Sequence, residues 1–271
     1  TLYYYCGISG HSGMGGQILT NSTTFGSTNF DGSILSVSQT NETSKLSILT
    51  YTGTGSAGSI GHGLNAVPKW ILIKDRDASR NWIVYHAQNT SEPETEYLHL
   101  NTENATQDSA IFFNDTAPTS SVISLGTGNN VNDSGNNYVA FVFAEVEGYS
   151  KFGSYIASGT SGDSAPFVFT GFRPAFVIVK NTTSSSYADW VIFDNVRDPV
   201  NIVDNYIAGN TSETDFTGGS TYPFMDFTSN GFKLRLGGTG SQVAYAVNRA
   251  SGDKYIYMAF AEQPFKFSNA R

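Results

Sequence analysis

Residues 69–74 read KWILIK and residues 81–85 read NWIVY, and these two strings decide the fold because each occurs twice. They return as AFVIVK at residues 175–180 and as DWVIF at residues 189–193. Both copies keep the same order and almost the same separation, which indicates a duplicated structural unit rather than shared composition. Most of the repeated residues are apolar, so the duplication concerns the architecture first.

A third string confirms that the repeat extends further along the chain. YVAFVFAE at residues 138–145 returns as YIYMAFAE at residues 255–262. At 271 residues the chain is long enough for two domains that each bury a core. The default interpretation is therefore two similar domains in tandem.

Composition and periodicity favour β-structure. Aromatic residues make up 14% of the chain and charged residues only 14%. Each repeat contains short runs rich in Val, Ile, Phe and Tyr that are separated by turns with Asn, Ser, Thr and Gly, a spacing typical of an antiparallel sandwich. Runs 70–73 and 139–143 are almost continuously apolar, as expected for strands covered on both faces. We expect at most one short helix, at residues 200–207.

We therefore predict an all-β chain of two tandem, homologous antiparallel β-sandwich domains preceded by a Gly/Tyr-rich N-terminal arm. The predicted boundaries are residues 1–43 for the arm or connector, 44–148 for the first repeat and 149–271 for the second. Residues 44–51 align with the stretch that starts at Ser150. The chain begins with Thr1 and lacks the pattern of a signal peptide, so we expect a fragment or processed product of a longer protein.

Several classes of protein do not fit this sequence. A net charge of −8 without a basic cluster argues against nucleic-acid binding. The longest apolar runs are far shorter than the roughly 20 residues of a membrane-spanning helix. Cys6 is the single cysteine, which excludes an internal disulfide framework and a thiolate metal site.

Catalytic and metal motifs are not apparent. The histidines lack the close-spaced pair that a zinc site commonly uses, no serine has the G-x-S-x-G spacing, and no glycine-rich stretch continues into G-K-[ST]. We predict no catalytic residues, no metal and no cofactor, and we interpret the four histidines as structural: His11, His62, His86 and His99.

Two pairs of carboxylates occupy equivalent positions, and a glycosidase needs two acids that face each other across a sugar. Glu145 and Glu262 end equivalent strands, and Asp115 and Asp226 are equivalent in the same way. Each pair is divided between the two predicted domains. Turn capping or hydrogen bonding at strand ends is the simpler interpretation.

The candidate ligand-binding residues are Asp194, Arg197 and Asp198, the densest charged group of the second repeat, with Tyr187 in the preceding Ser-rich loop. Carboxylates and guanidinium groups both satisfy sugar hydroxyl groups. The alternative is an Asp–Arg pair that only orders a loop. The tryptophans lie within apolar strands and are predicted to pack in the core: Trp70, Trp82 and Trp190.

Longer strings resemble structural proteins of marine tailed bacteriophages. They are GYSKFGSY at residues 148–155, TGFRPAFV at 170–177, SNGFKLR at 229–235 and YIYMAFAE at 255–262. The resemblance covers most of the chain from about residue 30 onward. The chain departs from it in the loop at residues 181–188 and at residues 237–253, and loops are where binding specificity varies on a fixed scaffold.

This resemblance implies a non-enzymatic virion component, often a tail-fibre or other exposed structural protein, and no catalytic residue is carried over. The expected partners are other virion proteins, copies of this chain and host cell-surface polysaccharide, and the expected location is the exposed surface of the virion. Three alternatives stay open: a capsid-decorating protein, a polysaccharide depolymerase, and a cellular lectin or surface-layer protein. The last would carry glycan on some of the sequons Asn21, Asn41, Asn89, Asn104, Asn114, Asn132, Asn181 and Asn210.

Overall fold

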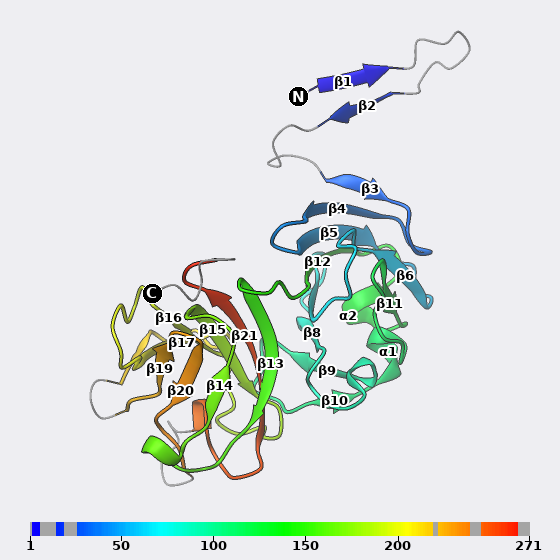
Figure 1. The fold of residues 1–271 in the computed structure, drawn as a ribbon. Coiled ribbons are helices and arrows are strands. Elements are labelled where there is room, and N and C mark those ends of the chain that lie inside the picture. Colours follow the sequence, from blue (N-terminus) through cyan, green and yellow to red (C-terminus); the bar gives the residue numbers. More distant parts are fainter. Residues whose placement is uncertain (1, 6–14, 19–25, 219–221, 239–244, 265–271) are drawn as a thin grey trace.

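The computed structural model describes residues 2–5, 15–18, 26–218, 222–238 and 245–264, which build an almost purely β-stranded protein (Figure 1). All the named strand pairs are antiparallel, and the helices are single short turns. The predicted all-β fold class is confirmed. Cys6 and His11 lie outside the described residues.

The first repeat is built on an eight-stranded sheet of order β10-β9-β8-β7-β12-β5-β4-β3, and a two-stranded sheet, β11-β6, packs on it with α1 and α2. A separate hairpin of β1 (Leu2–Tyr5) and β2 (Gly15–Ile18) precedes them. The elements of the first repeat are β3 (Ser27–Asn29), β4 (Ser36–Asn41), β5 (Leu46–Thr52), β6 (Gly58–Gly61), β7 (Trp70–Asp75), β8 (Ile83–His86), η1 (Pro93–Thr95), β9 (Glu96–His99), β10 (Gln107–Asp108), α1 (Ala110–Phe113), β11 (Val122–Leu125), α2 (Asn129–Asn132) and β12 (Asn137–Phe143).

The second repeat is built on a six-stranded sheet of order β13-β21-β15-β16-β17-β18, covered on one face by a three-stranded sheet, β14-β20-β19. Its elements are β13 (Ser150–Ile156), η2 (Gly162–Ser164), β14 (Phe167–Phe169), β15 (Pro174–Asn181), β16 (Val191–Asp194), β17 (Asn205–Ala208), β18 (Phe216–Thr217), β19 (Met225–Thr228), β20 (Gly231–Leu234) and β21 (Lys254–Ala261). The prediction of a helix at residues 200–207 is wrong. Tyr206 lies in β17 and packs between Phe193 and Phe216.

Three apolar cores hold the layers together. In β7, Ile71 and Ile73 point into the core of the first repeat, as alternation along a strand requires. Trp70 lies on the other face, where it meets Trp190 of the second repeat edge to face, with ring centroids 5.5 Å apart. The two large sheets therefore share a core between them, which explains the continuous apolar runs.

Polar bonds cross the same junction. The Trp190 indole Nε1 donates to the carbonyl of His99 at 2.8 Å, and Lys180 Nζ donates to the carbonyl of Glu103 at 2.9 Å. His86 Nε2 lies 3.1 Å from the carbonyl of Tyr257. Of the three tryptophans predicted to be core residues, Trp70 and Trp190 are fully buried, whereas Trp82 is half-buried.

The two repeats share atomic detail as well as topology. Tyr51 stacks on Tyr138 at 5.1 Å in the first repeat, and Tyr155 stacks on Tyr255 at 5.1 Å in the second. The hydroxyl groups of Tyr51 and Tyr155 donate to the main-chain carbonyls of Val131 and Val247, each in the segment before the last strand of its repeat. Tyr51 and Tyr155 are thus equivalent. The predicted alignment of residues 44–51 is wrong by two residues, a shift that leaves the buried face unchanged.

The predicted boundary at residue 43 is also corrected. Residues 27–41, assigned to the arm, form β3 and β4, and β4 pairs with β5 from Ser36↔Tyr51 to Asn41↔Leu46. Ile34 is buried in the first core. This segment therefore belongs to the first sandwich.

Candidate functional site

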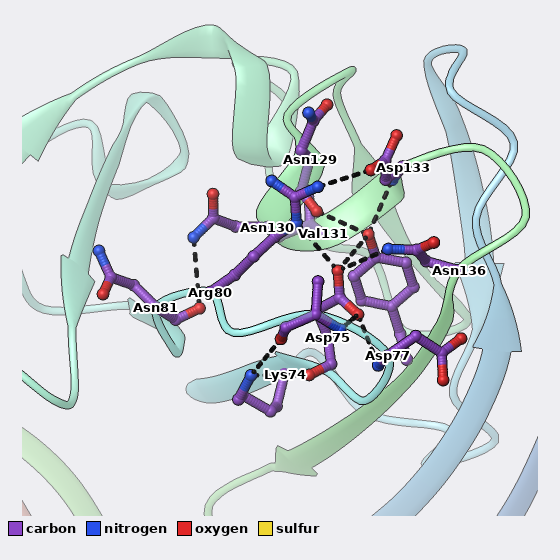
Figure 2. A network of polar contacts seen from close by, with 12 residues as sticks. Lys74, Asp75, Asp77, Arg80, Asn81, Asn129, Asn130, Val131, Asp133 and Asn136 are labelled. Atoms are coloured by element: carbon purple, nitrogen blue, oxygen red, sulfur yellow. Dashed lines mark hydrogen bonds and ion pairs between the residues drawn. The ribbon is translucent and has the colours of Figure 1, made fainter.

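The site with the most elaborate support lies where β7 ends, at Asp75. The Asp75 side chain is fully buried. Its Oδ1 accepts the amides of Asp77 (2.9 Å) and Ala78 (3.0 Å), which closes the turn that follows β7. Its Oδ2 accepts from Arg80 Nε at 3.1 Å and from Asn136 Nδ2 at 2.9 Å. Figure 2 shows these groups converging on one carboxylate.

The protonation state of Asp75 follows from these partners. Burial alone raises the pKa of a carboxyl group, but the hydrogen bonds from Asn136, from the amides of Asp77 and Ala78, and from Arg80 favour the ionised form and lower the pKa of Asp75. The carboxylate therefore stays charged at neutral pH. Its bonds are directed at the turn, so its role is to hold that turn.

Two further links fasten the turn to the rest of the first repeat. Arg80 Nη2 donates to Asp133 Oδ2 at 2.7 Å, just after α2. Asn130 Nδ2 donates to the carbonyl of Asn81 at 3.3 Å (Figure 2). Because the turn between β7 and β8 is bonded on both sides, the residues at its tip are fixed in position.

The tip of the turn borders a surface groove of about 490 Å³. Asp77 accepts both the main-chain and the side-chain N–H of Asn137, at 2.7 and 2.9 Å. Asn137 Oδ1 in turn accepts from the hydroxyl of Thr52 at 3.1 Å. The groove is lined by Ser33, Ile34, Leu35, Val37, Thr50, Tyr51, Thr52, Thr54, Arg76 and Asn137.

The groove combines one cation with hydroxyl groups and a small apolar patch. Arg76 is exposed, and within the described part of the chain its guanidinium group forms no ion pair. Leu35 and Val37 of the opposite wall are 57% and 40% exposed. Such a lining can bind an anionic group in bidentate fashion and hydrogen-bond to neighbouring hydroxyls.

The second repeat keeps the supporting turn but not the groove. Asn181 takes the place of Asp75, and its Oδ1 accepts the amides of Thr183 and Ser184 at 2.8 and 3.0 Å. The wall that β4 supplies has no counterpart, because β13 is the last strand of its sheet. In the described part of the chain, this groove with its β4 wall is therefore formed by the first repeat alone.

The predicted ligand-binding residues do not form one site. Asp194 Oδ1 accepts the amide of Arg197 at 2.8 Å, and the Arg197 guanidinium pairs with Asp194 and Asp215. Asp198 is buried and accepts the amides of Asp204 and Asn205 at 3.2 and 3.0 Å. These bonds order a loop.

Tyr187 lies apart from that loop. Strands β15 and β16 pair from Phe176↔Asp194 to Val179↔Val191, so Tyr187 lies beyond the opposite end of β16. It is 49% exposed, and its ring meets that of Tyr245.

The carboxylates considered for hydrolysis are engaged in pairs of their own. Glu145 accepts from Lys151 at 2.7 Å, and Glu262 lies 3.1 Å from Arg173. Asp226 is bound by Arg235, and Asp115 lies on an exposed turn. Within the described residues no group of three or more His, Cys, Asp or Glu side chains is placed to hold a metal ion.

Sequence reasoning missed the groove. A usable signal was the D-x-D-A-S string at residues 75–79, which combines turn-forming side chains directly after a buried strand.

Comparison with known proteins gives one result. Residues 20–264 match a family described as a domain of unknown function, DUF7483, and the chain belongs to that family. Because this single match spans both repeats, the family unit is the tandem pair. No curated protein and no solved structure matches the chain. Over the residues described, we find no helix with the length and apolar character to cross a membrane.

Proposed function

We propose that the chain is a non-enzymatic structural protein of a bacteriophage particle, a tail-fibre or other exposed adhesion component at the virion surface. It assembles with other virion proteins and with copies of itself, and it contacts polysaccharide on the host cell. The resemblance of its repeated strings to phage structural proteins supports the virion assignment. The groove beside Arg76 supports the adhesive role.

The geometry of the groove favours a saccharide that carries an anionic group. The guanidinium of Arg76 would pair with a carboxylate, and the hydroxyls of Thr50 and Thr52 with the carboxamide of Asn137 would meet the sugar hydroxyls. Leu35 and Val37 would pack against the apolar face of the ring. A shallow site of this kind binds weakly, and many copies on one particle multiply its strength.

Binding of the protein to an array of acidic and neutral polysaccharides tests the adhesive role. Arg76→Ala is expected to lower binding to acidic glycans about tenfold, the loss of one charge-assisted hydrogen-bonded contact. Lys254→Ala removes the same charge from the second repeat and serves as the control. If both variants bind acidic glycans as strongly as the native protein, the proposal that the groove beside Arg76 binds the glycan is wrong.

The location on the particle needs its own experiment. Gold-labelled antibodies against the chain should decorate the tail in electron micrographs of the phage. Decoration of the head instead would select the capsid-decorating alternative. If polysaccharide shortens on incubation and Glu145→Gln or Asp194→Asn prevents it, the depolymerase alternative holds.

The cellular-lectin alternative receives little support from the sequons. Asn89, Asn132 and Asn181 are buried. Asn132 Nδ2, for example, donates to the carbonyl of Ser56 at 2.7 Å. A glycan on any of these three residues is incompatible with the fold, and mass spectrometry of the intact protein would detect glycan on the exposed sequons.

A further inference from the structure

Strand β13 leaves one edge of the second repeat open. Among the described strands it pairs with β21 alone. Its equivalent in the first repeat, β5, is paired on both sides, with β12 and with β4. The second sheet therefore lacks the strand that completes the first.

The hydrogen bonds between β13 and β21 show which main-chain N–H and C=O groups of β13 point away from the sheet. Ala157 N donates to the carbonyl of Asp253 at 2.7 Å, as Gly53 N donates to that of Asn136 in the first repeat. Because consecutive residues of an antiparallel ladder bond to opposite sides, Ser154 and Ile156 direct their N–H and C=O groups outward. An edge of this kind is a template for a further strand.

β13 and the neighbouring small sheet expose three large apolar side chains. Ile156, Phe167 and Phe169 are 55%, 46% and 62% exposed. By the register of the small sheets, Phe167 and Phe169 occupy the positions of Ser59 and Gly61 in the first repeat.

In the first repeat those positions are covered. Ser33 N donates to the carbonyl of Ser59 at 3.0 Å, and a Cβ added at Gly61 would lie 2.3 Å from Asn29 Oδ1. Exposed phenylalanines have thus replaced small, covered residues.

Among the described residues, the segment that precedes β13 does not cover this edge. The strand that covers β5 is β4, which directly precedes it in the chain. Ahead of β13 stand only residues 144–149, and these fold back on its start, where Val146 N donates to Ser150 Oγ at 3.0 Å.

We propose that a second copy of the chain covers the edge, with the two β13 strands pairing antiparallel about a two-fold axis at Ser154. In this register Ser154 faces Ser154, and Phe152 faces Ile156, so outward-directed groups meet and apolar side chains oppose each other. The amide of Phe152, which donates to Glu145 Oε2 at 3.3 Å within the chain, would change its acceptor to the carbonyl of Ile156 in the second copy. Lys151 faces Ala157, which keeps like charges apart. The two six-stranded sheets become one continuous sheet.

A groove of about 400 Å³ gives the second strand room. Residues from both faces of β13, Ser154 on one and Gly153 on the other, line it, so it runs along the edge itself. Lys69 and Gln88 of the first repeat also line it.

Two variants test the pairing in the full-length chain. Ser154→Pro removes an outward N–H and leaves the bonds to β21 in place, whereas Ser154→Ala keeps the N–H. In sedimentation velocity at increasing concentration, the native chain and Ser154→Ala should dimerise, and Ser154→Pro should do so at least about tenfold more weakly. A native chain that stays monomeric, or a proline variant that dimerises equally well, refutes the proposal.

A cross-link keeps the test independent of how well the proline variant folds. In a Cys6→Ser background, Ser154→Cys should form an intermolecular disulfide on oxidation, because residues facing each other in a hydrogen-bonded pair have Cα atoms about 5.5 Å apart. Ser164→Cys, exposed on η2, should not. Equal cross-linking of the two variants, or none at Ser154→Cys, refutes the register.

This inference rests on the proposed function only in so far as that function includes assembly with copies of the chain. Arg76→Ala should lower glycan binding and leave the dimer intact, so failure of the adhesive role and failure of the β13 pairing are separate outcomes.

Discussion

His86 of the first repeat and Tyr257 of the second are joined by a 3.1 Å hydrogen bond between the imidazole Nε2 and a main-chain carbonyl. Nδ1 accepts the amide of Gln88 at 3.0 Å, which places the proton of the neutral ring on Nε2. A second proton would have to displace that amide. The histidine is thus held neutral at the junction of the two sheets.

Acid is expected to weaken the protein through His86. Burial lowers the pKa of His86 from 6.5 to about 4. Between these values the unfolded chain binds a proton that the folded protein does not, so stability falls as the pH drops through this window, by up to about 3 kcal/mol. Urea unfolding of the native protein and of His86→Gln from pH 7 to pH 4 measures the effect. A variant with the same pH slope as the native protein would contradict it.

Lys180 is expected to make the stability of the folded protein depend on pH above pH 8. Burial lowers the pKa of Lys180 to about 8, although its Nζ donates to the carbonyls of Ala188 and Glu103. From pH 8 to 10.5 the unfolded chain binds the extra proton, so this residue makes stability rise with pH. Lys180→Met should abolish that rise and cost about 1–3 kcal/mol for the unpaired carbonyls. Lys74→Met, at the equivalent but half-buried position, is the control and should change stability less.

Asp and Asn exchange positions between the two repeats, which predicts that two substitutions in the first repeat partly compensate each other's effect on stability. Asn136 donates to Asp75 in the first repeat, and Asn181 donates to Asp253 at 3.2 Å in the second. Asp75→Asn alone should cost about 3 kcal/mol, because it leaves Arg80 without its buried partner. Asp75→Asn combined with Asn136→Asp reproduces the second arrangement and should recover part of the loss. A double-mutant cycle by chemical denaturation measures this coupling, and strictly additive effects would count against it.

A second exchange concerns side-chain volume. Leu49 faces Ala140 in the first sheet, and Gly153 faces Tyr257 in the second. A Cβ at Gly153 would lie 2.4 Å from the Tyr257 hydroxyl, so Gly153→Ala should destabilise the protein by about 1–3 kcal/mol. Gly153→Leu with Tyr257→Ala copies the first repeat and should melt at a higher temperature than Gly153→Leu alone. Identical melting temperatures would show that the two positions are independent.

The sequence predicts the central strands well because their apolar residues are numerous and repeated. It does not predict β4, because Ser36 and Ser38 point inward there while Val37 points outward, the reverse of the usual alternation. The Asp75 site was missed for a related reason. Its residues differ between the repeats, because Asp and Asn have exchanged positions there.

β13, which opens the second repeat, lies beside the strand that closes it, and the equivalent strand of the first repeat, β5, lies beside β12 in the same way. Ser150 at the start of β13 pairs with Phe260 near the end of β21, and Leu46 at the start of β5 pairs with Phe143 at the end of β12. A unit whose entrance and exit are neighbours can be copied within a gene and inserted next to itself without any strand changing its partner. The same geometry allows an array of such units to grow by whole modules, each joined to the next by a connector as short as residues 144–149.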